Sequence, residues 1–208
     1  MLSVTMTKKL KHFSIDVSFQ VQKEVVVLFG PSGSGKTTIL NAISGITNPD
    51  IGFIQLNDRP LFQTKRSALP VQKRQLGYLF QDYALFPHMT VKKNIQYGMK
   101  DTALVKRLVD VVGIHPLLHS YPHQISGGEK QRVALVRALA TKPEALLLDE
   151  PFSALDEKTR IECQDELLRL HAEWNIPVIM VTHNEKEAEK LGDRILHIEK
   201  GKLINKPV

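Results

Sequence analysis

The sequence predicts an α/β protein with a mostly parallel sheet, an N-terminal antiparallel β portion and an inserted helical subdomain. Continuous apolar runs such as "VVVLF" and "ALLLD" are typical of strands buried on both faces, and helical patterns follow them. Strands that alternate with helices form a parallel sheet with helices on its faces. Between residues 81 and 121 the period is helical, which predicts the inserted subdomain. Ligands of such sheets bind at the carboxyl ends of the strands.

The predicted elements follow one another in a regular order. Short strands are expected within the first 30 residues, because "FSIDVSFQV" alternates apolar and polar residues and "VVVLF" is continuously apolar. A glycine-rich turn then leads into a helix from Lys36 to Ser44. The remaining elements are a hairpin or sheet edge at 51–62, a strand ending at Phe80, the helical segment, a helix to Ala140, a strand at 144–150, a helix at 157–174, a strand at 177–183, a short helix to Leu191, and terminal strands around 194–199 and 201–205.

The composition limits the class of protein. A chain of 208 residues with 42% hydrophobic residues can build one well-packed domain with an inserted lobe. No apolar run approaches the roughly 20 residues that cross a bilayer, and the start "MLSVTMTKKLKH" is too charged for a secretory signal, so we expect a soluble cytosolic chain. The single cysteine, Cys163, excludes an internal disulfide and a cysteine-rich metal site. The net charge of +6 is spread along the chain, which favours an ordinary solvated surface over a nucleic-acid site.

A phosphate-binding loop is the first functional motif. The segment "GPSGSGKT" fits G-x-x-x-x-G-K-[ST] and lies between a buried strand and a helix, as this pattern requires. Glycines let backbone N–H groups point at a phosphate, and the helix N-terminus adds its positive end. Lys36 is expected to reach the β- and γ-phosphates, and Thr37 to hold Mg²⁺. The fold predicted is therefore a P-loop NTPase of the RecA type. GTPases are disfavoured because no N-K-x-D segment occurs, and the terminal "NKPV" lacks the aspartate.

Two further strand ends carry candidate catalytic groups. Asp149 ends the strand "ALLLD" and can bind the Mg²⁺ shell, while Glu150 can orient or deprotonate the attacking water. An acidic pair after a strand is otherwise more often a helix cap, but the phosphate loop reverses that preference. His183 ends "PVIMVTH", where it can contact a γ-phosphate, although a lone histidine is more often structural.

An ordered series of motifs across nearly the whole chain resembles the ATP-binding subunits of ABC transporters. The series is "GPSGSGKT", "LFQD", the signature "ISGGEKQR", "LLLDEP", "SALD" and "VTH". The resemblance implies an ATPase that works as a homodimer, in which each of two ATP molecules lies between the phosphate loop of one subunit and the signature of the other. It implies Mg²⁺ ligands at Thr37, Gln81 and Asp149, and catalytic roles for Lys36, Glu150 and His183. The nucleotide-binding residues that it implies are Gly30, Pro31, Ser32, Gly33, Ser34, Gly35, Lys36, Thr37, Thr38, Gln81, Ser126, Gly127, Gly128, Glu129 and Asp156.

The signature segment combines two glycines with a glutamate. Ser126 and Glu129 match the capping box S-x-x-E, in which each side chain bonds the backbone amide of the other residue. Glu129 should therefore fold back from the nucleotide, screened by Lys130 or Arg132. Glycines in the first turn leave the N–H groups bare, so that the γ-phosphate on a second subunit can approach the helix N-terminus.

Within the family, the likeness is greatest to the molybdate importers of bacteria. It rests on "LNAISGIT", "GYLFQDYALFPHMTV", "QYGM" and the glutamate of "SGGEKQR". The phrase "LFPHMTV" is shared with importers of sulfate, polyamines, sugars and iron, which stay open as alternative solutes. The basic charge is the one feature that favours an ABC ATPase acting on DNA. Such proteins usually carry a coiled-coil or zinc insertion between the phosphate loop and the signature, and this sequence has neither there. For the residue that stacks on adenine the candidates are His12 and Phe13, but alternation could equally place Phe13 in the core, and we expect it there rather than against the base.

The resemblance also implies partners. A short helix of an integral-membrane permease is expected to dock on the segment after Gln81, which places the chain at the cytoplasmic face of the plasma membrane. The docking residues would be Tyr83, Ala84, Leu85, Phe86, Pro87 and Met89. An extracytoplasmic oxyanion-binding protein would act indirectly, and no nucleic-acid partner is expected. We expect a single ABC ATPase domain, with residues 1–80 and 135–208 as the core lobe and 81–134 as the helical subdomain, and no C-terminal regulatory domain within the sequence.

Overall fold

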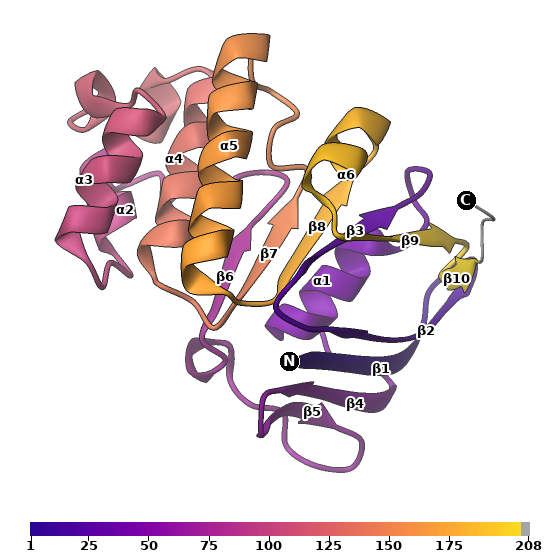
Figure 1. Ribbon diagram of the computed structural model, residues 1–208. Coiled ribbons are helices and arrows are strands. Elements are labelled where there is room, and N and C mark those ends of the chain that lie inside the picture. Colours follow the sequence, from indigo (N-terminus) through magenta and orange to yellow (C-terminus); the bar gives the residue numbers. More distant parts are fainter. Residues whose placement is uncertain (205–208) are drawn as a thin grey trace. The chain divides into compact units, whose positions relative to one another are not determined.

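The N-terminal strands form an antiparallel sheet portion, visible at the lower right of Figure 1. The strands β1 (Leu2–Lys9), β2 (Ser14–Val21), β4 (Ile51–Leu56) and β5 (Arg59–Gln63) pair in the antiparallel pairs β1–β2, β1–β4 and β4–β5. In β2 buried and exposed residues alternate one by one, as the pattern "SIDVSFQV" predicts. The antiparallel N-terminal portion and the hairpin at 51–62 are confirmed. The computed structural model describes residues 1–204, so the terminal "NKPV" lies outside the described residues.

Parallel strands form the centre of the same sheet. The strand β8 (Val178–Thr182) lies between β3 (Val25–Phe29) and β7 (Ala145–Asp149), and β9 (Arg194–Glu199) pairs with the other edge of β3. A last strand, β10 (Lys202–Ile204), pairs antiparallel with β9. All residues of β7 and β8 are buried, as expected for strands covered on both faces. The helix α1 (Lys36–Ser44) follows β3 and packs on β7 and β8, and α6 (Glu185–Leu191) follows β8 and packs on β3 and β8.

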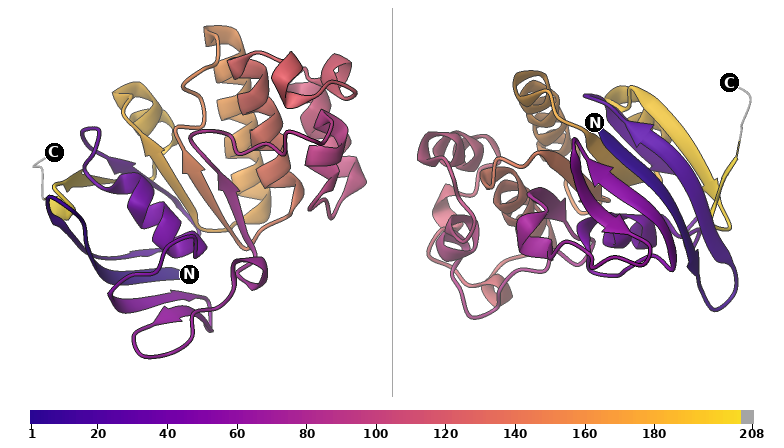
Figure 2. Two further views of the ribbon diagram at one scale, coloured as in Figure 1. Left: turned by 180° about the vertical axis from the view of Figure 1, so that it is seen from behind. Right: turned by 90° about the horizontal axis from the view of Figure 1, so that it is seen from below.

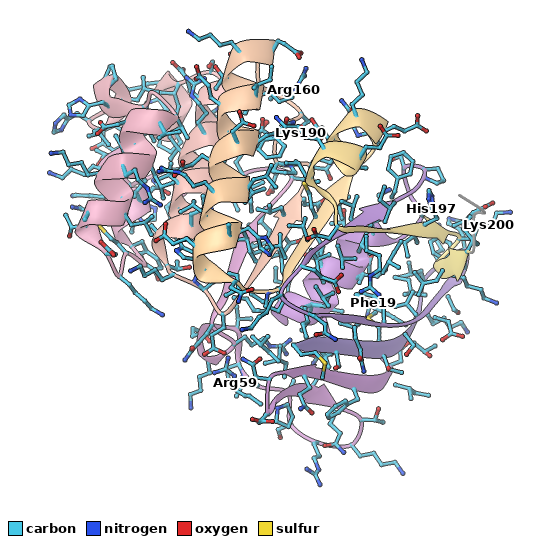
Figure 3. The ribbon with its side chains drawn as sticks, viewed as in Figure 1. Phe19, Arg59, Arg160, Lys190, His197 and Lys200 are labelled. Atoms are coloured by element: carbon cyan, nitrogen blue, oxygen red, sulfur yellow. The ribbon has the colours of Figure 1, made fainter. Side chains whose placement is uncertain are left out.

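The C-terminal end of α1 is closed by a buried arginine. Arg74, 1% exposed, follows a short 3₁₀ turn, η1 (Val71–Lys73). Its Nη1 donates to the carbonyl oxygens of Ala42 and Ile43 at 3.2 and 2.7 Å, and its Nε donates to that of Leu69 at 2.8 Å. These bonds satisfy helix carbonyls that have no intrahelical partner. Desolvation of the buried guanidinium lowers the pKa of Arg74. Arg59, labelled in Figure 3, donates to the carbonyl oxygen of Arg74.

A second group of elements consists mainly of helices, shown together in Figure 2. After β6 (Leu76–Leu79) come α2 (Val91–Gln96), α3 (Thr102–Val111), α4 (Gly127–Ala140) and α5 (Glu157–Trp174), with 3₁₀ turns η2 (His115–Leu117) and η3 (Pro122–Gln124) between α3 and α4. Side chains of Thr90, Asp101 and Ser126 cap the first turns of α2, α3 and α4. Residues 80–90 form no helix, so the helical period begins later than the sequence indicated.

The chain divides into two compact units. The first comprises Met1–Leu76, Glu144–Asp149 and Asn175–Val208, and the second comprises Gly77–Pro143 and Glu150–Trp174. This division differs from the predicted boundaries, which assigned residues 135–143 and the helix 157–174 to the core lobe. In the structure α5 packs against α3 and therefore belongs with the helical unit. Among residues 1–204, none of the helices combines the length and the apolar character needed to cross a membrane.

Candidate functional site

Strand register brings three predicted site segments to one edge of the sheet. Phe29, the last residue of β3, is paired with Thr182, the last residue of β8, and Asp149 of β7 is paired with Val181. All three strands are parallel, so their carboxyl ends meet at this edge. The phosphate loop, Asp149 and His183 therefore leave neighbouring strands within the first unit. This convergence is what the sequence predicted from strand ends alone.

The phosphate loop has the backbone that anion binding requires. Gly33 and Gly35 have φ angles of 78° and 103°, in the left-handed region that favours glycine. A Cβ on Gly30 would lie 2.1 Å from the carbonyl oxygen of Ile198, so only glycine fits there. No side chain caps the N-terminus of α1, and its first N–H groups have no intrahelical acceptor. Backbone amides at a positive helix end fit a polyphosphate.

Lys36 lies at the centre of this loop. Its side chain is buried, and Nζ donates to the carbonyl oxygens of Gly30 and Pro31 at 2.7 and 2.9 Å. The hydroxyl of Ser34 lies 3.5 Å from the same nitrogen. Loop oxygens thus hold the ammonium group inside the curve of the backbone, where an anion bound by the loop would meet it. Thr37 follows on the first turn of α1 and is half-buried.

The neighbouring strand ends hold one buried carboxylate and one exposed imidazole. Asp149 is 1% exposed, whereas His183 is exposed. The turn at His183 is fixed on both sides: the hydroxyl of Thr182 donates to Glu187 at 2.7 Å and accepts the N–H of Asn184 at 3.1 Å. Asn184 in turn caps α6. A hydroxyl from Thr37 and a carboxylate from Asp149 are oxygen ligands of the kind that Mg²⁺ takes, so these residues fit the ion.

The signature segment forms the predicted capping box in the second unit. The Ser126 backbone N–H donates to Glu129 Oε2 at 2.7 Å, the Ser126 hydroxyl lies 2.9 Å from the same oxygen, and the Glu129 N–H donates back to that hydroxyl at 3.4 Å. These bonds lower the pKa of Glu129, and Arg132 adds a smaller contribution of the same sign. The prediction that Glu129 folds back into the cap is confirmed.

The two signature glycines have different surroundings. A Cβ on Gly127 would meet no atom within 4 Å, so this residue presents bare backbone at the helix end. A Cβ on Gly128 would lie 2.8 Å from the carbonyl oxygen of Ala154. Gly128 therefore allows the first turn of α4 to pack against the segment that follows β7, and Gly127 leaves the helix N-terminus open.

The segment from Glu150 to Asp156 is held by α4. Glu150 has a φ of 50°, which is rare for a residue with a side chain. Gln131 of α4, 1% exposed, donates through Nε2 to the Glu150 carbonyl oxygen at 2.9 Å. Its Oε1 accepts the N–H of Ala154 at 2.9 Å. At the other end, the Asp156 carboxylate accepts the N–H of Thr159 at 3.1 Å, which lowers the pKa of Asp156.

The segment after Gln81 is a loop with an unusual backbone. Tyr83 and Ala84 have φ angles of 64° and 43°. Arg137 of α4 donates to the carbonyl oxygens of both residues at 2.8 Å, and its guanidinium lies 5.5 Å from the centre of the Phe86 ring. The loop is half-buried to exposed, from Gln81 through Met89. This exposure agrees with the expectation that the predicted docking residues are accessible rather than core residues: Tyr83, Ala84, Leu85, Phe86, Pro87 and Met89.

A second polar side chain closes the same loop from α2. Asn94 is fully buried; its Oδ1 accepts the Phe86 N–H at 2.8 Å, and its Nδ2 lies 3.1–3.2 Å from the carbonyl oxygens of Phe86, Met89 and Thr90. The centroids of the Phe86 and Tyr97 rings lie 4.8 Å apart, and Tyr97 is 69% exposed. Phe86 and Tyr97 therefore form an accessible aromatic pair, and the loop backbone that carries Phe86 is held by hydrogen bonds to Asn94.

Of the two candidates for adenine stacking, the structure brings Phe13 near the phosphate loop. His12 is exposed and Phe13 is half-buried. A Cβ on Gly35 would lie 3.5 Å from Phe13 Cε2, so the ring borders the start of α1. Phe13 is thus neither a core residue nor remote from the loop.

Three supporting residues were not found from the sequence: Gln131, Arg137 and Asn94. Each lies inside a helical pattern, where a polar residue is normally assigned to the solvated face. A polar residue at an otherwise apolar helix position is the signal that could have identified Gln131 and Asn94, because both are fully buried.

Comparisons with known proteins agree with the motif series. A family model described as "ABC transporter" matches residues 14–153. The molybdenum import ATP-binding protein ModC of Haemophilus influenzae is 47% identical over 205 residues, which cover 97% of this chain and 58% of that protein. The Fe(3+) ions import ATP-binding protein FbpC of Haemophilus influenzae is 42% identical over 198 residues, 91% of this chain and 56% of that protein. The chain spans less than two thirds of the length of these relatives.

A solved structure matches the fold closely. The dimeric structure of a post-hydrolysis state of an ATP-binding cassette bound to ADP and Pi has a TM-score of 0.85 and 28% sequence identity. The match covers 100% of this chain and 98% of that one. The α/β fold with an antiparallel N-terminal portion is therefore the fold of this cassette.

Proposed function

The chain belongs to the ABC transporter family, and from that premise we propose that it is the ATP-binding subunit of an importer. In this role it hydrolyses ATP to drive the uptake of an oxyanion, with molybdate as the first candidate. The observation that carries the proposal is the meeting of the phosphate loop, Asp149 and His183 at one sheet edge. A phosphate cradle, an acidic strand end and a histidine are the groups that nucleotide hydrolysis needs.

The nucleotide-binding roles follow from the loop geometry. Backbone N–H groups of residues 30–38, except Pro31, which has none, and the Lys36 ammonium bind the β- and γ-phosphates. Thr37 and Asp149 supply oxygen ligands to Mg²⁺. Gln81 is proposed as a further ligand of the ion. Bound Mg²⁺ neutralises charge that develops on the transferred phosphate. Phe13 is proposed to contact the base, since its ring borders Gly35.

Two copies of the chain are proposed to enclose two ATP molecules. The open α4 N-terminus offers the bare N–H groups of Gly127 and Gly128 to the γ-phosphate held by the other copy. Asp156 lies after the same signature-bound segment and would contact the nucleotide site of the partner copy. The similar cassette was solved as a dimer with ADP and Pi, which supports this arrangement.

Hydrolysis is assigned to Glu150 and His183. Glu150 orients or deprotonates the attacking water, and His183 contacts the γ-phosphate as charge develops. The exposed imidazole at the end of β8 is accessible to a bound nucleotide.

The partners are a permease and, indirectly, an extracytoplasmic oxyanion-binding protein. The permease is proposed to dock a short helix on the loop after Gln81, where Phe86 and Tyr97 form an accessible aromatic pair. This docking places the subunit at the cytoplasmic face of the plasma membrane. The likeness to FbpC supports iron as the alternative solute, with lower identity than the likeness to ModC.

Transport assays test the proposal directly. The chain is co-expressed with a candidate permease encoded by a neighbouring gene, and membrane vesicles are prepared from these cells. ATP-dependent uptake of molybdate, sulfate and Fe(3+) into the vesicles is then measured. Molybdate uptake that is lost in Lys36→Ala supports the proposal. Uptake of Fe(3+) alone would favour the alternative solute, and ATP hydrolysis stimulated by duplex DNA instead of permease would overturn the importer assignment.

A further inference from the structure

A buried glutamine in the signature helix contacts the backbone that carries the proposed catalytic glutamate. Gln131 is 1% exposed, and its amide is fully engaged by the segment 150–154. Nε2 donates to the Glu150 carbonyl oxygen at 2.9 Å and to the Ser153 hydroxyl at 3.2 Å, while Oε1 accepts the Ala154 N–H at 2.9 Å. Both the donor and the acceptor of the Gln131 side-chain amide are therefore used within this segment.

The backbone that Gln131 holds is strained. Glu150 has a φ of 50°, and left-handed residues that carry a side chain persist only where their surroundings hold them. A bond to the Glu150 carbonyl fixes the peptide plane that follows, and thereby the direction in which the Glu150 side chain leaves the backbone. Sub-ångström placement of a catalytic base changes the rate strongly.

The same helix begins at the signature. Ser126, Gly127 and Gly128 form its first turn, and Gly128 packs against the Ala154 carbonyl oxygen. Gln131 is one turn further along α4. The distance from the open helix N-terminus to the Glu150 backbone is therefore spanned by one turn of helix and one side chain, inside a single compact unit.

We propose that Gln131 is a positioning residue that connects the two ATP sites of the dimer. This inference rests on the proposed function, in which the N-terminus of α4 contacts the ATP bound by the partner copy. Gln131 sets the geometry of Glu150, and Glu150 acts on the ATP bound by its own copy. ATP binding at one site then changes the position of the catalytic base Glu150 at the other site through α4 and Gln131 alone, without any part of the first unit. Positive cooperativity of turnover with respect to ATP follows.

Two substitutions separate this role from simple packing. Gln131→Met keeps the volume and removes every hydrogen bond, whereas Gln131→Glu keeps the acceptor for Ala154 and removes the amide donor to Glu150. The matched control is Gln164→Met: Gln164 is a buried glutamine on α5 and, among the described residues, makes no hydrogen bond to segment 150–155. Steady-state ATP hydrolysis is measured against ATP concentration, together with nucleotide affinity and thermal unfolding.

For both Gln131 variants we expect kcat to fall by about 10- to 100-fold with nucleotide affinity within about threefold of wild type. The Hill coefficient for ATP should fall towards one, while Gln164→Met keeps both the wild-type kcat and the wild-type Hill coefficient. An unchanged Hill coefficient and kcat in Gln131→Glu would overturn the inference. So would a loss of kcat matched by an equal loss of affinity and thermal stability, since that result indicates packing alone.

The controls distinguish this inference from the function on which it rests. If the wild type turns over ATP and Glu150→Gln does not, but Gln131→Glu behaves as wild type, only the positioning role fails. If Glu150→Gln retains wild-type turnover, the catalytic assignment fails and the positioning role fails with it.

Discussion

At the scale of single residues, Ser126 binds the Glu129 carboxylate at the helix end where the phosphate held by the second copy is proposed to bind. Glu129 would repel a nearby phosphate, but its carboxylate accepts the Ser126 N–H and contacts the Ser126 hydroxyl at the helix end. We predict that Glu129→Gln retains ATPase activity and tightens ATP-dependent dimerisation by a few-fold, because the amide can cap as well and removes one negative charge. Sedimentation of the wild type and the variant at equal ATP concentration measures the effect; weaker dimerisation of the variant would contradict it.

The same residue predicts a pH dependence of stability. The pKa of Glu129 is lowered by its bonds to Ser126, so the folded protein binds this proton less readily than the unfolded chain. Its contribution to the free energy of unfolding is therefore present above the ordinary carboxyl pKa of about 4.3 and is lost as the pH falls through the lower folded value. Urea unfolding of the wild type and Glu129→Gln should show a stability difference at pH 7 that shrinks as the pH falls below the ordinary carboxyl pKa of about 4.3.

Arg74 is a residue whose role is structural. It is buried without a carboxylate partner among the hydrogen bonds described, and its three acceptors are backbone carbonyl oxygens at the end of α1 and at Leu69. We predict that Arg74→Met lowers the free energy of unfolding by roughly 2–4 kcal/mol, because buried carbonyls lose their donor. Arg66→Met is the control, since Arg66 is exposed, and it should change stability by less than about 0.5 kcal/mol. Equal effects in urea titrations of both variants would contradict the capping role.

At the scale of elements, the loop after Gln81 is rigid because two helices hold it. Arg137 of α4 bonds the left-handed pair Tyr83 and Ala84, and Asn94 of α2 bonds Phe86 and its neighbours. A preorganised surface loses little entropy when a partner docks. We predict that Phe86→Ala lowers permease recovery in a pull-down by at least about tenfold, since aromatic residues at interface centres contribute most. Nucleotide affinity should be unchanged, and equal recovery of wild type and variant would count against the docking site.

Periodicity and motif spacing predicted most elements, whereas the side-chain hydrogen bonds between residues of different elements could not be predicted. The helices 36–44 and 157–174 begin and end where the sequence patterns indicated. The sequence predicts a helical period from residue 81, but Tyr83 and Ala84 are left-handed and bond Arg137, which is more than 50 residues away along the chain. Local patterns cannot show such a bond. The individual roles of Gly127 and Gly128 likewise depend on where Ala154 lies.

At the scale of the whole molecule, the predicted site residues are distributed over two compact units. The phosphate loop, Asp149 and His183 belong to the first unit, and the signature, Gln81 and Glu150 belong to the second. The sequence could identify these groups because the motifs are local and ordered. It could not assign α5 to the helical unit, since the helix follows a strand and reads as one more α/β crossover; its packing on α3 decides the matter.

The proposed dimer gives a prediction about assembly. Glu150→Gln keeps the size of the side chain and removes the proposed catalytic base, so ATP should bind and bridge two copies without being hydrolysed. We predict that this variant accumulates as a stable dimer with ATP and Mg²⁺ and that its turnover falls by at least about 100-fold. Light scattering after size exclusion measures the mass. Lys36→Ala is the control, because it lacks the ammonium held within the phosphate loop and should stay monomeric at the same ATP concentration. If Glu150→Gln stays monomeric at saturating ATP and Mg²⁺, two copies of this chain do not share their nucleotides, and the role given to the open helix end at Gly127 is wrong.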